Sequence, residues 1–488
     1  MPSTVSKDLT ALAGLWGPRV DYAADPTRWV TERIGAFLWS VQRRVMELVR
    51  DHRYVAVPSC HDAGKSYLAA AIACWWLDSH TVGEAFVVTT APTDAQVKAI
   101  LWREIGKMQR AGGLAGKVTK QAHWYMGPDN VELVAYGRKP ADHVSHEEAA
   151  ASFSGIHARY VLIILDEAGG IPVWLYNAVD TLATNVHCRV LAIGNPDDPG
   201  SQFAKVCAPG SGWTVQPISA FDTPNFTDEA VPEYLNDLLI SKVWVQERKK
   251  RWGEKNPLYQ SKVLGLFPEV GDHNLIQPAW VLAAQNRSIV PNQFDSVLGV
   301  DVARFGSDET CGYLRQGNHI RRVFSGHGWP TTETTGKVKQ FIFGNTHPVR
   351  AQVDDVGVGG GVLDQLVEDG FDAVGLNGGS TCKQKLKDGR NRFVNARSEW
   401  YWELRGKLQD GEIDLDPEDD DLAAQLVDIR WGTNSKGQIW VEAKEDMKAR
   451  GVDSPDRADA VVYSNATAHQ AQPVARTQIR DRRLAGRR

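Results

Sequence analysis

The sequence predicts an α/β protein with two sheet-bearing domains, and three observations support that prediction. Short β-branched runs alternate with helical stretches from Tyr54 to about Gly194, and a second alternating region begins at Ser296. A proline-punctuated stretch at residues 266–295, which we expect to be a linker, separates the two regions. Apolar strands separated by helices are typical of a parallel sheet that is buried on both faces.

Length and composition are consistent with this architecture. At roughly 150 residues per domain, 488 residues suit two or three domains. The chain is 42% hydrophobic and 24% charged with a net charge of −5, so a nucleic acid would have to be met by local basic patches. Six scattered cysteines, none of them in CxxC spacing, predict neither a zinc site nor disulfides. No apolar run approaches the roughly 18 to 20 residues that cross a bilayer, so we expect a cytoplasmic protein outside the membrane.

The first alternating region is expected to form five strands with helices between them. Polar helices with breakers over residues 222–262 then predict a small appendage to this domain. We therefore expect the following division of the chain: a first domain 1–215, an appendage 216–265, a linker 266–295, a second domain 296–470 and a tail 471–488. The predicted strands are 54–59, 85–91, 131–137, 160–168 and 189–196, and the predicted helices are 65–77 and 97–109.

The second region begins with three consecutive strands and continues as helix, strand and helix. This order indicates a mixed sheet that opens with an antiparallel meander. In the tail, six arginines and one aspartate give residues 475–488 a net charge of +5, and we expect disorder there in isolation. The predicted strands are 296–303, 310–315, 320–325 and 350–354, and the predicted helices are 332–343 and 362–368.

A phosphate loop is predicted at SCHDAGKS, which fits GxxxxGK[ST] with Ser59 in place of the first glycine. A strand precedes it and an alanine-rich helix follows, so backbone N–H groups and the helix N-terminus can cradle phosphate oxygens. Lys65 would reach the β- and γ-phosphates, and Ser66 would bind Mg²⁺. A chance GKS at a strand-to-helix turn is the alternative. The expected nucleotide contacts are Ser59, Cys60, His61, Asp62, Ala63, Gly64, Lys65 and Ser66.

Two later strands end in polar residues that complement this loop. The apolar run VLIILDEA ends in Asp166, which can hold Mg²⁺ through water, and Glu167, which can polarise the water that attacks the γ-phosphate. After LAIG, Asn195 can contact the γ-phosphate or that water, although an ordinary Asn-Pro turn is the alternative.

Upstream, Gln42 lies on an amphipathic helix and could read an adenine edge while Trp39 packs on the ring; an exposed helix glutamine is the alternative. An arginine that stabilises transition-state charge is also expected. Arg103, Arg138 and Arg159 are candidates, and the sequence does not choose among them.

A carboxylate metal site is predicted in the second region. Asp301 lies in the middle of an apolar strand, where an unpaired charge would cost several kcal/mol. Asp354 and Asp355 end another strand, and Asp456 and Asp459 share a helix face at i and i+3. Together they would hold two Mg²⁺ or Mn²⁺ ions for phosphodiester hydrolysis, with Asp354 preferred to Asp355. Taken singly, each aspartate could instead be a cap or turn residue.

Two neighbouring features have simpler interpretations. The glycines of residues 357–361 could be a dinucleotide fingerprint, but their spacing does not fit GxGxxG after a first strand. Lys444 and Lys448 could touch scissile phosphates, although a solvated position is favoured for both.

In this order the motifs resemble the large terminase subunit of tailed bacteriophages, the motor that packages viral DNA. The resemblance is carried by SCHDAGKS, YVLIILDEA, LAIGNP, GVDVARFGSDET, VDDVGVGGGVLDQL and SPDRADAVV. It implies a P-loop ATPase domain of the additional-strand class with a small helical lid, joined to a ribonuclease H-like nuclease domain. It also implies that ATP hydrolysis drives double-stranded DNA into a procapsid and that concatemeric DNA is cut by two-metal chemistry.

The resemblance assigns roles by position. It implies ATP and Mg²⁺ as cofactors, with Mn²⁺ possible at the nuclease site, and a location in the host cell cytoplasm. Its partners would be double-stranded DNA, the portal protein, the small terminase subunit and further copies in a ring, a pentamer on the portal. The chain has His61 and Asp62 where many members carry a basic residue, so the side chain that senses the γ-phosphate stays open. It has Ser154 where some members have an arginine, so the trans-acting arginine finger stays unassigned. The matched residues are Lys65, Ser66, Asp166, Glu167 and Asn195 in the motor, and Asp301, Asp354 and Asp459 in the nuclease.

Two other classes of function remain open. One is a host defence or repair ATP-dependent nuclease, which shares the same chemistry. The other is a structural DNA-binding protein with degenerate sites, which the two intact acidic sets disfavour.

Overall fold

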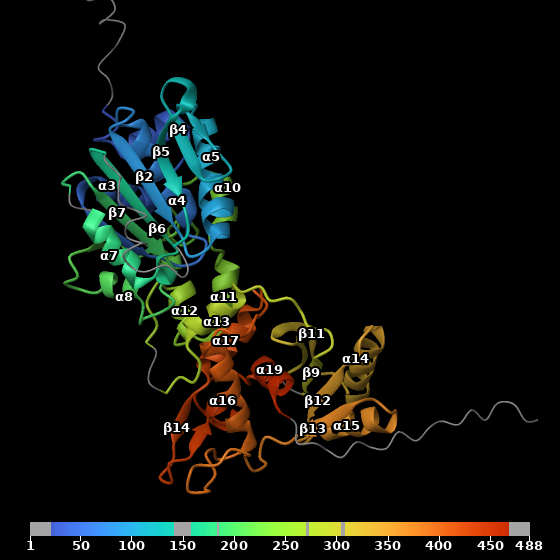
Figure 1. The fold of residues 1–488 in the computed structure, drawn as a ribbon. Helices are drawn as coiled ribbons and strands as arrows, with labels where there is room; N and C mark the ends of the chain where they lie inside the picture. Colours follow the sequence, from blue (N-terminus) through green and yellow to red (C-terminus); the bar gives the residue numbers. More distant parts are fainter. Residues whose placement is uncertain (1–20, 141–157, 183–184, 270–272, 304–307, 468–488) are drawn as a thin grey trace, which may run out of the picture. The chain divides into compact units, whose positions relative to one another are not determined.

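The computed structural model describes residues 21–140, 158–182, 185–269, 273–303 and 308–467 (Figure 1). The chain divides into two compact units at residue 270, and each is described by itself. Ser154 and the predicted basic tail lie outside the described residues. Within the described part, no helix is both long and apolar enough to span a lipid bilayer.

The first unit is built on an eight-stranded sheet in the order β3-β4-β5-β2-β6-β7-β1-β8. In the order of the sheet, the six strands β5, β2, β6, β7, β1 and β8 pair in parallel. Strands β3 and β4 form an antiparallel edge that the sequence analysis did not predict. The strands are β1 (Tyr54–Pro58), β2 (Ala85–Thr90), β3 (Lys117–Val118), β4 (His123–Met126), β5 (Glu132–Gly137), β6 (Tyr160–Asp166), β7 (Arg189–Gly194) and β8 (Thr214–Val215).

Strand β7 lies between β1 and β6 and pairs in parallel with both. It is the extra strand that defines the additional-strand class, so this part of the predicted fold is confirmed. Parallel strands have their carboxyl ends at one edge of a sheet. The last residues of β1, β6 and β7, which are Pro58, Asp166 and Gly194, therefore lie at the same edge. The three predicted polar motifs follow these strand ends.

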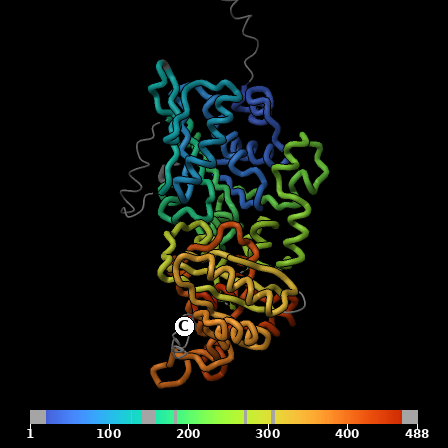
Figure 2. The backbone as a smooth tube through the Cα atoms, turned by 90° about the vertical axis from the view of Figure 1, so that its right-hand side faces the viewer, coloured from blue at the N-terminus to red at the C-terminus, as the bar shows by residue number. Residues whose placement is uncertain are grey.

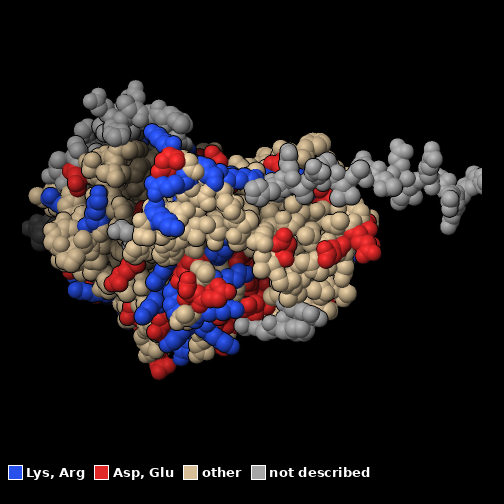
Figure 3. Space-filling model, turned by 90° about the horizontal axis from the view of Figure 1, so that it is seen from below, with Lys and Arg blue, Asp and Glu red and all other residues tan. Residues whose placement is uncertain are grey.

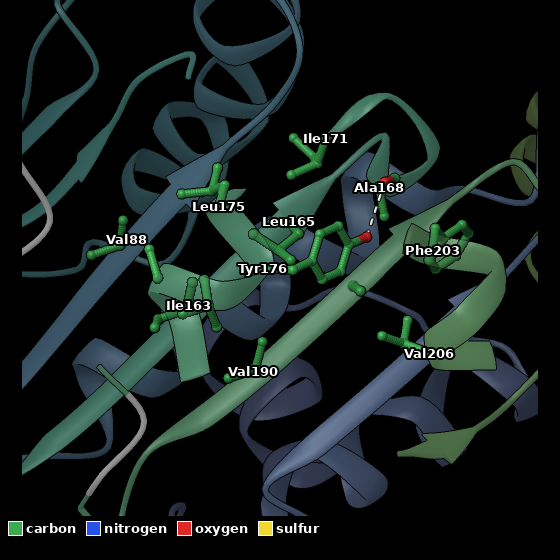
Figure 4. Close-up of a cluster of buried hydrophobic side chains, with 14 of the residues drawn as sticks. Val88, Ile163, Leu165, Ala168, Ile171, Leu175, Tyr176, Val190, Phe203 and Val206 are labelled. Atoms are coloured by element: carbon green, nitrogen blue, oxygen red, sulfur yellow. Dashed lines mark hydrogen bonds between the residues drawn. The ribbon is translucent and has the colours of Figure 1, made fainter. Parts of the chain in front are cut away.

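Both faces of the sheet are buried, as a parallel sheet requires. Helices α7 and α8 cover one face, where Ile163 and Leu165 of β6 pack against Leu175 and Phe203 (Figure 4). Leu162 and Ile164 alternate with these residues and point to the opposite face, and both are fully buried. Every residue of α4 from Leu68 to Leu77 is buried, as expected of a helix that is apolar on all sides.

Several helices of the first unit flank the sheet, and four short helices, α9 to α12, follow β8 (Figures 1 and 2). The predicted helix 97–109 begins instead as a wider π-helical stretch, Gln96–Leu101, and continues as α5. The helices are α2 (Pro26–Trp29), α3 (Ser40–Asp51), α4 (Lys65–Asp78), α5 (Trp102–Ala111), α7 (Val173–Leu182), α8 (Gln202–Cys207), α9 (Pro224–Thr227), α10 (Glu233–Leu238), α11 (Lys242–Trp252) and α12 (Pro257–Lys262).

The second unit contains a five-stranded mixed sheet in the order β11-β10-β9-β12-β13. Strands β9, β10 and β11 form the predicted antiparallel meander, and β12 pairs in parallel with β9 and β13. A separate two-stranded sheet pairs β14 with β15. The strands are β9 (Ser296–Asp301), β10 (Glu309–Gln316), β11 (His319–His327), β12 (Arg350–Asp354), β13 (Ala373–Leu376), β14 (Trp431–Thr433) and β15 (Ile439–Val441).

Two expectations about this unit need correction. Asp301 is the last residue of β9 and not a mid-strand residue, because the pairing with β10 stops at Asp301 opposite Cys311. The stretch predicted as a linker contains helix α13, with Pro278 at its first position, where a missing N–H costs nothing. The helices are α13 (Pro278–Gln285), α14 (Thr331–Gly344), α15 (Gly359–Glu368), α16 (Ala396–Gln409), α17 (Asp420–Asp428), α18 (Lys444–Ala449) and α19 (Asp456–Asn465).

Charge is distributed over the surface in patches. On the face drawn in Figure 3, basic and acidic side chains lie next to each other, beside large areas without charged residues. A net charge of −5 therefore does not prevent local positive surface.

Candidate nucleotide and metal sites

The predicted phosphate loop connects β1 to the N-terminus of α4. Ser59 extends β1, because its N–H donates to the carbonyl of Gly194 at 3.0 Å. The N–H groups of Cys60 and His61 donate to the carbonyls of Ile218 and Lys262 at 2.8 and 2.9 Å. These first three residues of the loop therefore use their N–H groups to fix its position.

The next five residues of the loop do not use their N–H groups in this way. Within the described part of the chain, the N–H groups of Asp62 to Ser66 donate to no protein acceptor. They lie at the start of α4, where the helix dipole adds partial positive charge. A run of free donors at a helix N-terminus is suited to bind phosphate oxygens.

Two predicted side chains contact the loop itself. The amine of Lys65 donates to the carbonyl of Cys60 at 3.0 Å. The amide of Gln42 donates to the carbonyl of Ala63 at 3.2 Å, and Gln42 is only 4% exposed. The alternative of an exposed helix glutamine is therefore wrong, and Gln42 supports the loop from the side of α3.

The acidic pair follows β6. Asp166 is buried, and burial together with the neighbouring Glu167 raises the pKa of Asp166 to about 7, while Lys65 opposes the shift. Glu167 adopts a left-handed backbone conformation, and its N–H donates to Asp166 Oδ1 at 3.2 Å. A buried carboxylate beside the phosphate loop is an oxygen donor that suits Mg²⁺.

Asn195 and a residue that the sequence analysis missed lie at the end of β7. The amide of Asn195 donates to the carbonyl of Ser59 at 2.7 Å, which ties β7 to the phosphate loop. Asp197 accepts a hydrogen bond from the hydroxyl of Ser261 in α12, and burial raises the pKa of Asp197. No pattern in the sequence pointed to Asp197, since its partner lies 64 residues further along the chain.

The three candidate arginines lie in different surroundings. Arg103 is 3.6 Å from Glu104, and Arg159 is 3.8 Å from Glu84. The guanidinium of Arg138 lies over the ring of Tyr136, 5.0 Å from its centroid. The structure thus singles out none of the three.

The second site forms where β9, β12 and α19 meet. Because β9 and β12 are parallel neighbours, Asp301 and Asp354 end at the same edge of the sheet. A Cβ at Gly299 would come within 2.1 Å of the carbonyl of Ala460, so glycine lets α19 lie directly against β9. That close approach places Asp459 of α19 beside the strand end.

Lys444 lies among these carboxylates. Its amine is 3.1 Å from Asp301, 3.0 Å from Asp459 and 3.5 Å from Asp456. Burial raises the pKa of Asp301 well above its ordinary value, and Lys444 only partly opposes this. The pKa of Lys444 itself is raised well above its usual range, because Asp459 and Asp301 outweigh the effect of burial. Lys444 is therefore not a solvated surface lysine, whereas Lys448, which pairs with Asp308 at 2.9 Å, is half exposed.

Two residues of α16, which the sequence analysis did not identify, hold Asp459. Tyr401 donates from its hydroxyl to Asp459 Oδ1 at 2.7 Å, and Arg397 donates to the same oxygen at 3.3 Å. Although burial opposes it, Lys444 and Arg397 lower the pKa of Asp459, so this carboxylate is ionised. No motif marks Arg397 or Tyr401 in the sequence.

Asp354 and Asp355 point in different directions. Asp354 Oδ2 accepts from the hydroxyl of Tyr463 in α19 at 3.1 Å. A Cβ built on Gly375 would lie 2.8 Å from Asp355 Oδ2, so Asp355 faces β13. Only Asp354 therefore faces the helix that carries Asp459. The glycines after this strand begin α15, in place of a dinucleotide fingerprint.

The donor set fits a hard divalent cation. Within the described residues, no three His, Cys, Asp or Glu side chains are close enough to hold a metal ion by themselves, and Lys444 stands between the carboxylates. Four acidic side chains, which we call the acidic cluster, nevertheless lie around two cationic ones, Lys444 and Arg397, and leave an excess of carboxylate oxygen. The acidic cluster consists of Asp301, Asp354, Asp456 and Asp459. Carboxylate oxygens are the preferred ligands of Mg²⁺ and Mn²⁺.

Comparisons with known proteins agree with the motifs. No protein-family model matches the chain. A protein of Enterobacteria phage P7 named "Probable terminase, large subunit" is 25% identical over 348 residues, which cover 65% of this chain and 65% of that protein.

Two solved structures can be compared with the chain. A large terminase from a thermophilic bacteriophage covers 88% of this chain and 98% of its own, at 13% identity and a TM-score of 0.41. The nuclease domain of the large terminase subunit gp2 of bacterial virus Sf6 covers 39% of this chain and 96% of its own, at 21% identity and a TM-score of 0.34. These TM-scores are too low to assign a function. The chain is thus similar in sequence to a large terminase subunit, as its motifs predict.

Proposed function

We propose that the chain is a viral DNA-packaging motor that hydrolyses ATP to move double-stranded DNA into a procapsid and cuts concatemeric DNA. One observation carries this proposal. At one edge of the first sheet, the five free N–H groups at the start of α4 lie near the carboxylates at the end of β6. A second, separate sheet carries the acidic cluster that the cutting reaction needs. The named relative from phage P7 supports the same interpretation.

In the motor site, the N–H groups from Asp62 to Ser66 bind the phosphates of ATP. Lys65 exchanges its contact with the carbonyl of Cys60 for the β- and γ-phosphates, which neutralises charge as the terminal phosphate leaves. Ser66 and Asp166 would hold Mg²⁺, which supplies additional positive charge at the phosphates. Glu167 orients the attacking water and accepts its proton.

In the nuclease site, Asp301, Asp354 and Asp459 would hold two Mg²⁺ or Mn²⁺ ions. Such ions activate a water molecule and stabilise the leaving 3′ oxygen of a phosphodiester. Tyr401 and Arg397 fix the orientation of Asp459, and Lys444 favours the ionised form of Asp459 and partly opposes the loss of charge on Asp301.

We extend the proposal to the partners of such a motor. These are double-stranded DNA, the portal protein, the small terminase subunit and further copies of the chain in a ring, a pentamer on the portal, in the host cell cytoplasm. The chain can couple ATP hydrolysis to DNA movement only together with those partners. A test of the proposal must therefore include them.

A packaging assay tests the proposal. Purified chain, small subunit, portal-bearing procapsids of its own phage, linear DNA and ATP are expected to give DNA that resists DNase. The Lys65→Ala variant, a matched control for the assay, should give none. ATP-dependent cutting of DNA without any protected DNA would favour a defence or repair nuclease instead.

A further inference from the structure

Residues 383–392, between β13 and α16, form a basic hairpin that the proposed function leaves unexplained. Lys385 and Asn391 pair as an antiparallel bridge, and the N–H of Leu386 donates to the carbonyl of Arg390 at 2.7 Å. The N–H of Arg392 closes the base on the carbonyl of Gln384 at 3.0 Å. The segment is therefore an ordered hairpin with a defined position for its side chains.

The basic hairpin carries strong positive charge that is open to solvent. Five basic residues and one acidic residue give it a net charge of +4. Within the described part of the chain, one ion pair involves it, between Arg390 and Asp388 at 2.6 Å. The basic residues are Lys383, Lys385, Lys387 and Arg390, which are exposed, and Arg392, which is half buried.

The basic hairpin is fixed to the helix that holds Asp459. Glu399 of α16 is 3% exposed and accepts the N–H groups of Lys383 at 2.7 Å and Gln384 at 2.9 Å. Arg397 and Tyr401, two residues before and after Glu399 on α16, contact Asp459. One helix turn thus anchors both the basic hairpin and a carboxylate of the acidic cluster.

A second anchor joins the base of the basic hairpin to β15. The N–H of Ile439 donates to the carbonyl of Arg392, and the N–H of Val394 donates to the carbonyl of Ile439, each at 2.9 Å. The chain continues from β15 into α18, whose first residue is Lys444. The base of the basic hairpin is therefore anchored both to α16, which contacts Asp459, and to β15, which leads into the helix of Lys444.

We propose that the basic hairpin binds the phosphate backbone of double-stranded DNA and holds the duplex at the acidic cluster. The inference rests on the proposed nuclease function and names the surface that positions its substrate. A cluster of buried carboxylates repels a polyanion, and the chain as a whole is negative. A group of cations anchored to the helix that holds Asp459 offsets this repulsion, and phosphate contacts fix the register of a duplex without reading its sequence.

The test is a triple variant of the full chain, Lys385→Gln, Lys387→Gln and Arg390→Gln. The matched control, Lys337→Gln, Lys339→Gln and Arg350→Gln, removes the same charge from α14 and β12 of the same unit. Affinity for a short fluorescent DNA duplex is measured by anisotropy with EDTA, so that no cutting occurs, over a KCl series. Unchanged melting temperatures of both variants serve as the folding check.

We expect the hairpin variant to bind about tenfold more weakly at low salt, with a slope of log K against log salt reduced by about 2 to 3. Cutting by this variant with Mn²⁺ should show a raised KM for DNA and an unchanged kcat, and the control variant should behave as the unaltered chain. Equal affinities and slopes for hairpin variant and unaltered chain would overturn the proposal. If the hairpin variant lost portal binding alone and still bound DNA, the proposal would be overturned, and the basic hairpin would instead bind an acidic surface of the portal protein. An unaltered chain that neither hydrolyses ATP nor cuts DNA would instead refute the proposed function.

Discussion

At the scale of single residues, both candidate sites keep charged groups inside the protein and stabilise them by specific partners. Asp301 and Asp459 share Lys444, and Asp459 also has Arg397 and Tyr401. An ionised carboxylate in such a position is expensive unless it is paired. The partners of these carboxylates therefore determine how stable the site is without metal and how strongly it takes up a cation.

Lys444→Met removes the cation at the centre of the acidic cluster. We expect a loss of about 2 kcal/mol of stability, less than for a fully buried pair, because the side chain of Lys444 is 30% exposed. Mg²⁺ should raise the melting temperature more in this variant than in the unaltered chain, since the ion replaces the lost charge.

Lys448→Met is the control, because Lys448 lies on the same helix, is exposed and pairs with Asp308 at the surface. Its loss should cost less than about 1 kcal/mol. Thermal unfolding with and without MgCl₂ checks both variants, and an equal effect of Mg²⁺ in all three proteins would contradict the account of the cluster.

Asp197→Asn tests the buried contact between β7 and α12 through its pH dependence. The pKa of Asp197 is raised in the folded state, so its contribution to stability is full at low pH and is lost as the pH rises through that value. Asparagine stays neutral and can still accept the hydrogen bond from Ser261. The melting temperature of the variant minus that of the unaltered chain should therefore increase as the pH rises from the ordinary pKa of an aspartate, about 4, through the raised pKa of Asp197, and should level off above it. A difference that stays constant over this range would show that Asp197 is not destabilised by burial.

At the scale of elements, the sheet edge of the first unit depends on how closely β7 approaches the turn after β6. A Cβ on Gly194 would lie 2.6 Å from the backbone nitrogen of Ala168, the residue that follows Glu167. Only glycine leaves room there for the two strand ends to lie side by side. The position of Glu167 is thus set by a residue of the neighbouring strand.

Gly194→Ala should lower stability by about 1–3 kcal/mol and reduce ATP hydrolysis, because the turn that carries Glu167 must move. Gly336→Ala is a matched control within helix α14, where nothing lies within 4 Å of the added carbon. It should raise stability by about 0.5–1 kcal/mol and leave ATP hydrolysis unchanged. Urea unfolding and phosphate release measure the two effects, and a harmless Gly194→Ala would contradict the close approach.

Much of this element structure could be predicted from the sequence. Apolar runs such as those of β6 and β9 are distinct in a single sequence, and an acidic residue at the end of such a run, as with Asp166, marks a candidate site. Asp301 stood out as a charge in an apolar run, but the sequence did not show that it ends β9. Arg397 and Tyr401 could not be predicted as partners of Asp459, which lies about 60 residues away, because the contact depends on how α16 packs against α19. The short edge strands β3 and β4 were missed because two to four residues carry no periodic signal.

At the scale of the whole molecule, the two compact units carry different chemistry. The phosphate loop, Asp166 and Glu167 belong to the first unit, and the acidic cluster with its lysine belongs to the second. Each set is built on its own sheet, so neither needs the other unit for its local geometry. The account therefore predicts that the two activities can be removed one at a time from the full chain.

The most direct measurement compares ATP turnover and Mn²⁺-dependent plasmid cutting in two full-length variants, Lys65→Ala and Asp301→Asn. We expect Lys65→Ala to lose ATP turnover by at least about a hundredfold and to keep cutting, because Lys65 neutralises phosphate charge only in the first unit. Asp301→Asn should lose cutting by a similar factor and keep ATP turnover, because it removes a central metal ligand. Unchanged ATP turnover in Lys65→Ala, or unchanged cutting in Asp301→Asn, would contradict the account.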